Sequence, residues 1–230
     1  MQKSIINRKD EMDFRSAEAY KSLRTNIQFS GDQVKVIALT SCLPDEGKSS
    51  VAMNLALSFA DADKKVLLID ADMRKSVLVG RYRIQNAEFG LSHYLSGQCE
   101  WDQVLYQTNA ERLHMILSGP IPPNPSELLQ GERFKKLIKD LRNVYDYIII
   151  DCPPIGAVSD AVIVGNHSDG VALVMAAEKI SYKLAQKMKK QLQNGNCKIL
   201  GVILNKVPLK GKNYYGRYYG KYYGKDYYKK

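Results

Sequence analysis

A glycine, a lysine and two serines in the segment PDEGKSS (44–50) form the part of this sequence whose residue types and spacing point most directly to chemistry. The segment follows an apolar run and precedes a stretch of helix-forming residues. Glycine lets a backbone approach a ligand closely, and N–H groups at the start of a helix attract anions. A lysine followed by a serine then offers a positive charge to the β and γ phosphates of a nucleotide and a hydroxyl to Mg²⁺. The predicted nucleotide-binding residues of this phosphate-binding loop (P-loop) are Asp45, Glu46, Gly47, Lys48, Ser49 and Ser50.

Three aspartates follow other apolar runs. LLIDADMR places Asp70 and Asp72 at the end of one run, and YIIIDCPP places Asp151 at the end of another. Taken singly, each aspartate would more simply cap the next helix. Because the carboxyl ends of parallel strands share one edge with the P-loop, the three together are better explained as a site for ATP and Mg²⁺. Asp151 is expected to hold Mg²⁺ through water, and Asp70 to orient or deprotonate an attacking hydroxyl.

The expected cofactors are therefore ATP and Mg²⁺. The predicted metal-binding residues are Ser49, Asp70, Asp72 and Asp151. The predicted catalytic residues are Lys48, Asp70, Asp72 and Asp151. The loop is a variant of the usual G-x4-G-K-S pattern, because Cys42 replaces the first glycine.

Apolar runs predict the strands that position these residues. They span 35–41, 64–70, 112–118, 145–151, 169–177 and 198–205. Helices are expected after Ser16 as N-cap as far as Gly31, and over 49–62, 126–143 and 181–195. Because the runs are continuous rather than alternating, both faces of the sheet should be covered. The predicted fold class is α/β: a P-loop NTPase-type, mostly parallel sheet with helices on both faces, plus a flexible tyrosine-rich C-terminal tail.

The character of the chain changes at residue 210. The tail GKNYYGRYYGKYYGKDYYKK follows Lys210, and 210–230 holds eight of the chain's fifteen tyrosines and +6 of its net charge of +10. Since it has no aliphatic residue and frequent glycine, we expect it to be disordered. The predicted organisation is an N-terminal segment and helix over 1–34, a P-loop domain over 35–209 and the tail over 210–230.

Several classes of protein are disfavoured by composition. The four cysteines have neither a CxxC pair nor zinc spacing, so neither a disulfide framework nor a cysteine metal site is expected. No apolar run approaches the ~20 residues that a membrane helix needs, and the N-terminal residues lack the apolar core of a signal peptide. The sequence therefore predicts a cytoplasmic protein.

These motifs, together with SGPIPPNPSELL and the tail, resemble the bacterial tyrosine kinases (BY-kinases) of capsule and exopolysaccharide clusters, the CpsD or CapB type. The resemblance covers essentially the whole chain. It implies an ATP-dependent protein-tyrosine kinase in which Asp70 and Asp72 form the Walker A′ motif and Asp151 belongs to Walker B. It also implies transfer to tail tyrosines of a neighbouring subunit. The implied phosphoacceptors are Tyr214, Tyr215, Tyr218, Tyr219, Tyr222, Tyr223, Tyr227 and Tyr228.

Further residues match features of that family. Its E-x2-R-x2-R motif, used for subunit contacts in a ring, is matched by Glu18, Lys21 and Arg24, although a lysine in place of the family's first arginine loses bidentate pairing. Asp45 stands where glycine is common. Asn205, at the end of the last strand, resembles the asparagine that contacts adenine in related P-loop ATPases, the alternative being a simple strand-end turn.

The resemblance also implies partners. A transmembrane activator, or polysaccharide co-polymerase, would supply a cytoplasmic segment and recruit the kinase to the inner face of the plasma membrane. A homo-oligomeric ring and a counteracting tyrosine phosphatase are expected as well, with control of capsule or exopolysaccharide synthesis and export as the outcome.

Two alternatives are weighed against a kinase. Partitioning or division-site ATPases of the ParA/MinD kind carry a second lysine early in the loop, KGGxGKT, where this chain has Leu43. Nucleic-acid binding is suggested by tyrosines interleaved with Lys and Arg in the tail, because aromatic rings stack on bases. No recognisable RNA or DNA module accompanies the tail, so no nucleic-acid partner is expected.

Overall fold

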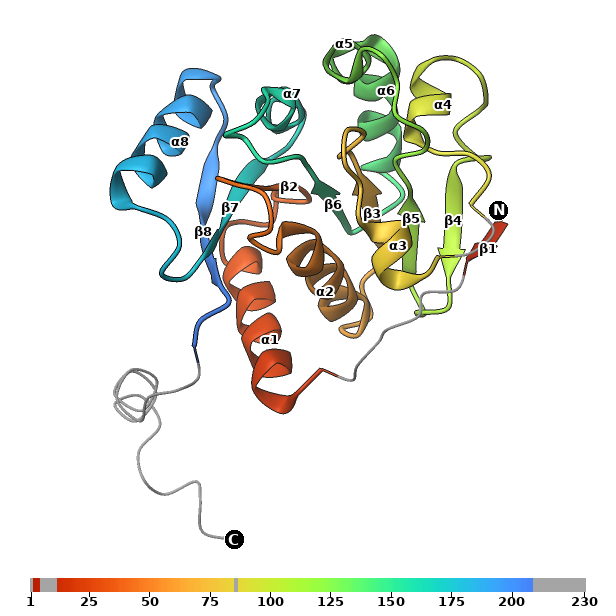
Figure 1. The fold of residues 1–230 in the computed structure, drawn as a ribbon. Coiled ribbons are helices and arrows are strands. Elements are labelled where there is room, and N and C mark those ends of the chain that lie inside the picture. Colours follow the sequence, from red (N-terminus) through yellow and green to blue (C-terminus); the bar gives the residue numbers. More distant parts are fainter. Residues whose placement is uncertain (1, 5–11, 85–86, 209–230) are drawn as a thin grey trace, which may run out of the picture.

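The computed structural model describes residues 2–4, 12–84 and 87–208, and the structural statements below concern these residues. One eight-stranded sheet runs through them in the order β1-β4-β5-β3-β6-β2-β7-β8 (Figure 1). The strands are β1 Gln2–Ser4, β2 Val36–Ser41, β3 Val66–Asp70, β4 Leu105–Thr108, β5 Leu113–Ile116, β6 Tyr147–Asp151, β7 Gly170–Ala176 and β8 Ile199–Asn205. Neighbouring strands are parallel except for the antiparallel pair β4 and β5. The predicted mostly parallel sheet is confirmed.

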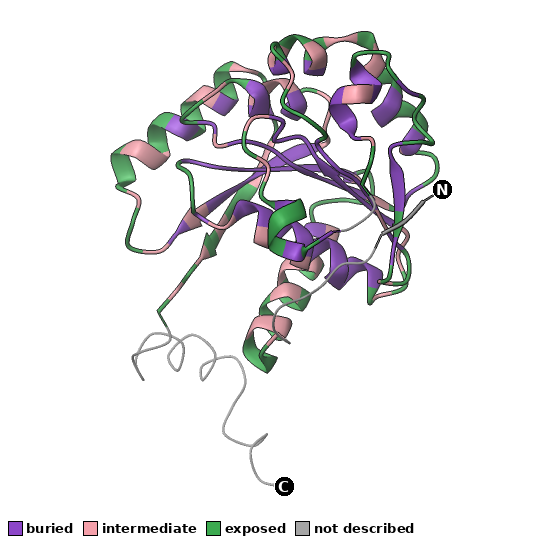
Figure 2. Cartoon of the chain, turned by 45° about the vertical axis from the view of Figure 1, so that its right-hand side comes forward, coloured by how far each residue is buried: buried purple, intermediate pink, exposed green. Residues whose placement is uncertain are grey.

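Helices cover both faces of the sheet, as the continuous apolar strands predict (Figure 2). They are α1 Phe14–Gln28, α2 Lys48–Ala60, α3 Leu78–Tyr82, α4 Leu91–Leu95, α5 Pro125–Gln130, α6 Glu132–Leu141, α7 Asp160–Gly165 and α8 Tyr182–Asn194. Helices α1, α2 and α3 pack on one face, and α4 to α8 lie on the other (Figure 1).

Alternate residues of a single strand belong to different cores. In β2, Ile37 and Leu39 pack in the core beneath α1 and α2, whereas Val36 and Ala38 pack in the core beneath α6 and α7. All four side chains are fully buried. Because successive side chains of a strand point to opposite faces, both faces must be apolar, and this requirement produces the uninterrupted apolar runs of the sequence.

The N-terminus of α1 differs from the prediction. Asp13, rather than Ser16, is the N-cap, and its Oδ1 accepts hydrogen bonds of 3.0 Å from the backbone N–H groups of Arg15 and Ser16. The Ser16 hydroxyl donates to the other carboxylate oxygen of Asp13 at 2.7 Å. A carboxylate that accepts two N–H groups at once competes well with a single hydroxyl for the capping position, so the helix begins before Ser16.

The helix expected over 126–143 is in fact two helices. Gly131 lies between α5 and α6 with an extended backbone (φ −67°, ψ 156°) and serves as C-cap of the first and N-cap of the second. The interruption lets α6 turn Phe134 into the core while α5 packs against α7. The sequence patterns also missed the short elements β1, β4, α3, α4 and α7, which carry too few residues for a clear period.

Candidate active site

The P-loop joins β2 to α2 at the carboxyl edge of the sheet, where it was predicted. Asp45 and Gly47 both have left-handed backbone conformations, with φ of 63° and 89°. Aspartate tolerates this region better than most residues. Glycine is required at position 47 for a second reason, because a Cβ placed there would lie 2.3 Å from Nδ2 of Asn205. The loop is therefore shaped by its own backbone and by the end of β8.

The side chain of Glu46 stabilises the P-loop through hydrogen bonds inside the protein. Its buried carboxylate accepts hydrogen bonds from the backbone N–H of Leu43 at 2.7 Å and from that of Ala176, at the end of β7, at 3.0 Å. The Glu46 side chain thus ties the loop to the neighbouring strand. Any contact of Glu46 with a nucleotide would have to come from its backbone, a distinction that the sequence pattern does not draw.

The predicted catalytic residues come together at this edge. Asp70 of β3 and Asp151 of β6 lie opposite each other in the strand register. The Lys48 ammonium, at the start of α2, lies 2.9 Å from Oδ2 of Asp72 and 3.4 Å from Oδ1 of Asp151. It also lies 3.2 Å from the hydroxyl of Ser49. All five residues are buried, so three carboxylates and one ammonium share a site largely removed from water.

Burial and crowding perturb the carboxylates. Burial, and then the charge of Asp151, raise the pKa of Asp70 to about 7, although a hydrogen bond from the Ser76 hydroxyl acts in the opposite direction. Burial also raises the pKa of Asp151 against the opposing charge of Lys48. For Lys48, burial favours the neutral amine, but the charges of Asp151 and Asp72 outweigh it and the pKa is raised. Lys48 therefore stays charged, while Asp70 can exchange a proton near neutral pH.

The donor set fits Mg²⁺ held partly through water and phosphate. In the part of the chain that the structure describes, no three His, Cys, Asp or Glu side chains converge as a ready-made metal cage. Oδ2 of Asp151 is buried and has no hydrogen-bond partner among these residues, so it is available to a water or an ion. Mg²⁺ commonly binds through one or two carboxylates, water and substrate phosphates rather than through an all-protein cage, and Ser49 and Asp151 suit that mode.

A network that sequence reasoning missed holds the loop after β3. Arg74 forms two hydrogen bonds to the fully buried carboxylate of Asp160 at the start of α7, at 2.7 and 3.1 Å. The hydroxyl of Ser126 in α5 donates to the same carboxylate at 2.6 Å and accepts from Arg74 at 2.9 Å. The network links LLIDADMR to SGPIPPNPSELL, and no local motif signals it, because its three residues come from three separate segments of the chain.

The remaining predicted residues lie in different places. Asn205 donates from Nδ2 to the carbonyl oxygen of Glu46 at 2.9 Å and therefore does lie at the P-loop. Glu18 and Lys21 form an exposed 2.7 Å ion pair on α1, away from the carboxylates. Arg24 donates to the backbone oxygen of Ser58 in α2 of the same chain. The eight predicted phosphoacceptor tyrosines lie outside the described residues.

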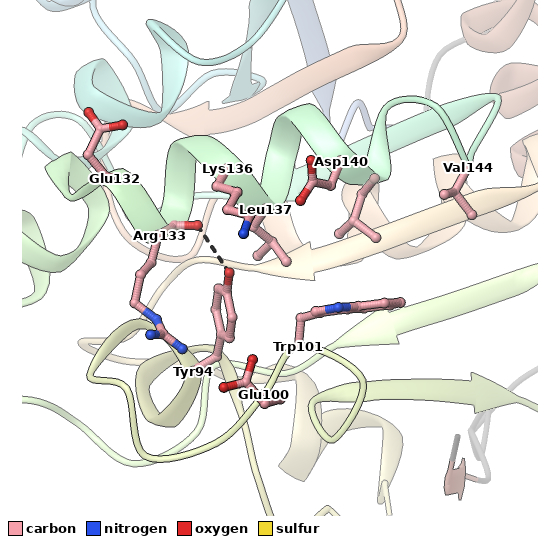
Figure 3. A pocket seen from close by; sticks show the side chains of 10 residues that line it. Tyr94, Glu100, Trp101, Glu132, Arg133, Lys136, Leu137, Asp140 and Val144 are labelled. Atoms are coloured by element: carbon pink, nitrogen blue, oxygen red, sulfur yellow. Dashed lines mark hydrogen bonds between the residues drawn. The ribbon is translucent and has the colours of Figure 1, made fainter.

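A surface groove lies apart from the P-loop, between α6 and the loop that follows α4 (Figure 3). Its volume is about 440 Å³. Trp101 and Val144 line it and are each 47% exposed, whereas Leu137 beneath them is buried. Figure 3 shows Arg133 and Tyr94 at the other end, where the Tyr94 hydroxyl donates to the Arg133 carbonyl at 3.4 Å. The groove shares no residue with the P-loop site.

The chain is similar to known proteins over almost its whole length. A family model described as AAA domain matches residues 34–198. Tyrosine-protein kinase CpsD of Streptococcus agalactiae serotype III is 45% identical over 203 residues, which cover 88% of each chain. Tyrosine-protein kinase YwqD of Bacillus subtilis is 41% identical over 94% of this chain and 91% of its own. The solved kinase domain of Escherichia coli tyrosine kinase ETK has a TM-score of 0.82 and 29% identity, covering 94% of this chain and 93% of that domain.

The parallel sheet, the P-loop and the AAA-domain match define a P-loop nucleotide-binding domain. The chain belongs to the CpsD-type family of bacterial tyrosine-protein kinases, and it is an enzyme of that class. The resemblance drawn from its motifs is therefore confirmed. No helix in the described ranges is both long and apolar enough to cross a membrane.

Proposed function

We propose that this kinase uses ATP and Mg²⁺ to phosphorylate the C-terminal tyrosines of a neighbouring copy of the same chain. The observation that carries the proposal is the position of the Lys48 ammonium, within 3.4 Å of Asp72, Asp151 and Ser49 at the end of a P-loop. A cation, carboxylates and a hydroxyl at the start of a helix are the groups that phosphoryl transfer from a nucleotide needs.

Each side chain has a defined part in the proposal. Lys48 binds the β and γ phosphates, together with the N–H groups of the loop and the start of α2. Ser49 and Asp151 would hold Mg²⁺, with Asp72 beside them, and the ion would supply positive charge to offset that of the phosphates. Asp70, whose pKa is about 7, accepts the proton of the tyrosine hydroxyl. A new bond then joins the phenol oxygen to the γ phosphorus, the bond from that phosphorus to the bridging oxygen breaks, and ADP leaves.

The charge and length of the tail favour it as the substrate. Its net charge of +6 is attracted to a site lined by carboxylates and by ATP phosphate. About sixteen residues of extended chain reach roughly 50 Å, enough to enter the site of a neighbour. The adenine contact predicted for Asn205 belongs to the same proposal; in the described residues its Nδ2 donates to the carbonyl oxygen of Glu46.

The test uses two purified variants that each lack one function. A chain ending at residue 208 keeps the site but has no tail, and full-length Lys48→Met keeps the tail but lacks the phosphate-binding cation. Incubation with Mg·ATP, followed by intact mass and site mapping, should show phosphate on the tyrosines of the Lys48→Met chain only when the two are mixed. If the wild type labels itself but the mixture stays unmodified, transfer between chains is refuted.

We also propose that a membrane partner controls the kinase. A transmembrane activator would recruit the cytoplasmic kinase to the inner face of the membrane through a cytoplasmic segment and raise its rate. A tyrosine phosphatase would reverse the modification, and the cycle would regulate capsule or exopolysaccharide synthesis and export. Equal rates of autophosphorylation with and without the cytoplasmic segment of the activator would contradict this regulation.

The proposed ring forms through the exposed face of α1. Glu18 and Lys21 are exposed and available to a second copy, whereas the described contact of Arg24 is with α2 of its own chain. Each phosphotyrosine adds about −1.5 to −2 charge, so eight change the tail from +6 to roughly −6 to −10. We expect this change to expel tails from neighbouring sites and to weaken the ring. Light scattering that gives one mass for both forms would refute the switch.

A further inference from the structure

Two side chains at the end of β8 donate to two successive carbonyl groups of the P-loop. Nδ2 of Asn205 donates to the carbonyl oxygen of Glu46 at 2.9 Å, and the ammonium of Lys206 donates to the carbonyl oxygen of Asp45. Both side chains also lie over the start of α2. A Cβ built on Gly47 would lie 2.3 Å from the Asn205 nitrogen and 3.8 Å from Cε of Lys206. We call this pair the Asn205–Lys206 clamp.

The backbone of Lys206 is unusual for a lysine. Its φ of 55° lies in the left-handed region, which non-glycine residues enter at a cost. Residues held in such regions persist where the surrounding structure requires them, and they cluster at functional sites. Here the turn directs the Lys206 side chain back across the P-loop.

A P-loop has a particular need for such donors. It binds phosphate because successive N–H groups point at the anion, and such a concave array arises where left-handed residues alternate with right-handed ones. The carbonyl groups of the same peptide units then point away from the anion and need hydrogen-bond donors of their own. Asp45 and Gly47 supply the left-handed positions, and the Asn205–Lys206 clamp supplies the donors.

Charge gives Lys206 a second effect. Asp45 is exposed and stands where glycine is common in this family, so its carboxylate brings negative charge close to bound phosphate. The ammonium of Lys206, hydrogen-bonded to the backbone of the same residue, places a positive charge beside it.

We propose that Asn205 and Lys206 are positioning residues that hold the P-loop in its phosphate-binding conformation, and that Lys206 also offsets the charge of Asp45. The proposal rests on the proposed role of this loop in binding ATP. Lys206 was absent from the residues predicted from sequence, because an exposed lysine after a strand carries no motif of its own.

The first test measures binding of Mg²⁺ and ADP carrying a fluorescent methylanthraniloyl group to the full chain. Lys206→Met should raise the dissociation constant about tenfold, the effect of losing a hydrogen bond from a charged donor. Lys206→Arg keeps a cationic donor and should stay within about threefold of the wild type. Lys187→Met, on the exposed face of α8, makes the same change of charge away from the P-loop and should bind like the wild type.

A double-mutant cycle separates the two effects of Lys206. The fold-increase in dissociation constant caused by Lys206→Met should be about three times smaller in an Asp45→Gly chain than in the wild type, because no Asp45 carboxylate remains to be offset. That difference should shrink in high salt, since charges at exposed sites are screened. Additive effects at low salt would overturn the charge offset.

Thermal unfolding tests whether Lys206 acts through binding or through stability. We expect Lys206→Met to unfold within a few degrees of Lys187→Met while binding nucleotide about tenfold more weakly. If Lys206→Met binds like the wild type while Lys48→Met does not bind, the clamp is refuted and the ATP site stands. If the wild type itself fails to bind the probe, the ATP site is refuted together with the clamp that rests on it.

Discussion

Replacing Asp70 by asparagine is expected to stabilise the folded protein at neutral pH while abolishing tyrosine phosphorylation. Asp70 is fully buried opposite Asp151, and burial together with that charge raises its pKa from 3.8 to about 7. The folded state therefore favours the protonated carboxyl group. The stability that the protonated Asp70 carboxyl group contributes is complete below about pH 4 and is lost as the pH rises through about 7. The Asp70→Asn variant loses no stability in this way.

The size of the effect follows from the shift. One pKa unit corresponds to about 1.4 kcal/mol, so ionising Asp70 costs the folded state at most about 4 kcal/mol. As the pH rises from about 5 to about 8, the free energy of unfolding of Asp70→Asn minus that of the wild type should increase by about 3 kcal/mol. This increase should level off above about pH 7. The asparagine can keep the hydrogen bonds with Ser76 and with the N–H of Asp72.

Urea unfolding at several pH values, without nucleotide or Mg²⁺, measures this difference. Asp61→Asn, which changes an exposed carboxylate after α2, is the matched control and should track the wild type. A difference between Asp70→Asn and the wild type that stays flat with pH, or that shrinks as the pH rises, would refute the reasoning. Such a result would mean that Asp70 is ionised in the folded state across this range.

Three further variants test other parts of the structure. Gly47→Ala places a Cβ 2.3 Å from Asn205 in a left-handed position, so it should cost about 1–3 kcal/mol in urea unfolding and weaken nucleotide binding at least about tenfold. Arg74→Met leaves the buried Asp160 carboxylate without its cation and should lower the free energy of unfolding by about 2 kcal/mol. The cost is less than for a fully buried pair because Arg74 is partly exposed. Adding Asp160→Asn to the same chain should recover part of that loss. Phe134→Ala removes a fully buried ring and should cost about 3–5 kcal/mol in the same assay, with nucleotide affinity of the folded fraction unchanged.

Local patterns were sufficient for the longer strands and helices and for the P-loop, but not for the short elements β1, β4, α3, α4 and α7. The strands found at β2, β3, β5, β6, β7 and β8 each lie inside a predicted run. For β2, β3, β5, β6 and β7 the reason is that a strand buried on both faces must be apolar throughout, whereas the edge strand β8 is apolar although it exposes Val202 and Leu204. Gly47, Lys48 and Ser49 are adjacent in sequence, so their joint role at the start of α2 is readable from the chain itself. The boundaries failed where two residues compete for one cap, as Asp13 and Ser16 do, and where Gly131 divides a helical pattern.

The sequence by itself determined the parallel α/β fold, the P-loop and the strand-end aspartates, because each depends on residues close together in the chain. Only the tertiary structure decided which aspartates reach Lys48, since Asp72 follows β3 and Asp151 ends β6, and the sheet order brings these two segments together. It also decided the antiparallel placement of β4, the Arg74 network and the approach of Lys206 to the P-loop. These contacts join segments far apart in the chain, and a pattern confined to one segment carries no information on which distant segment will pack beside it.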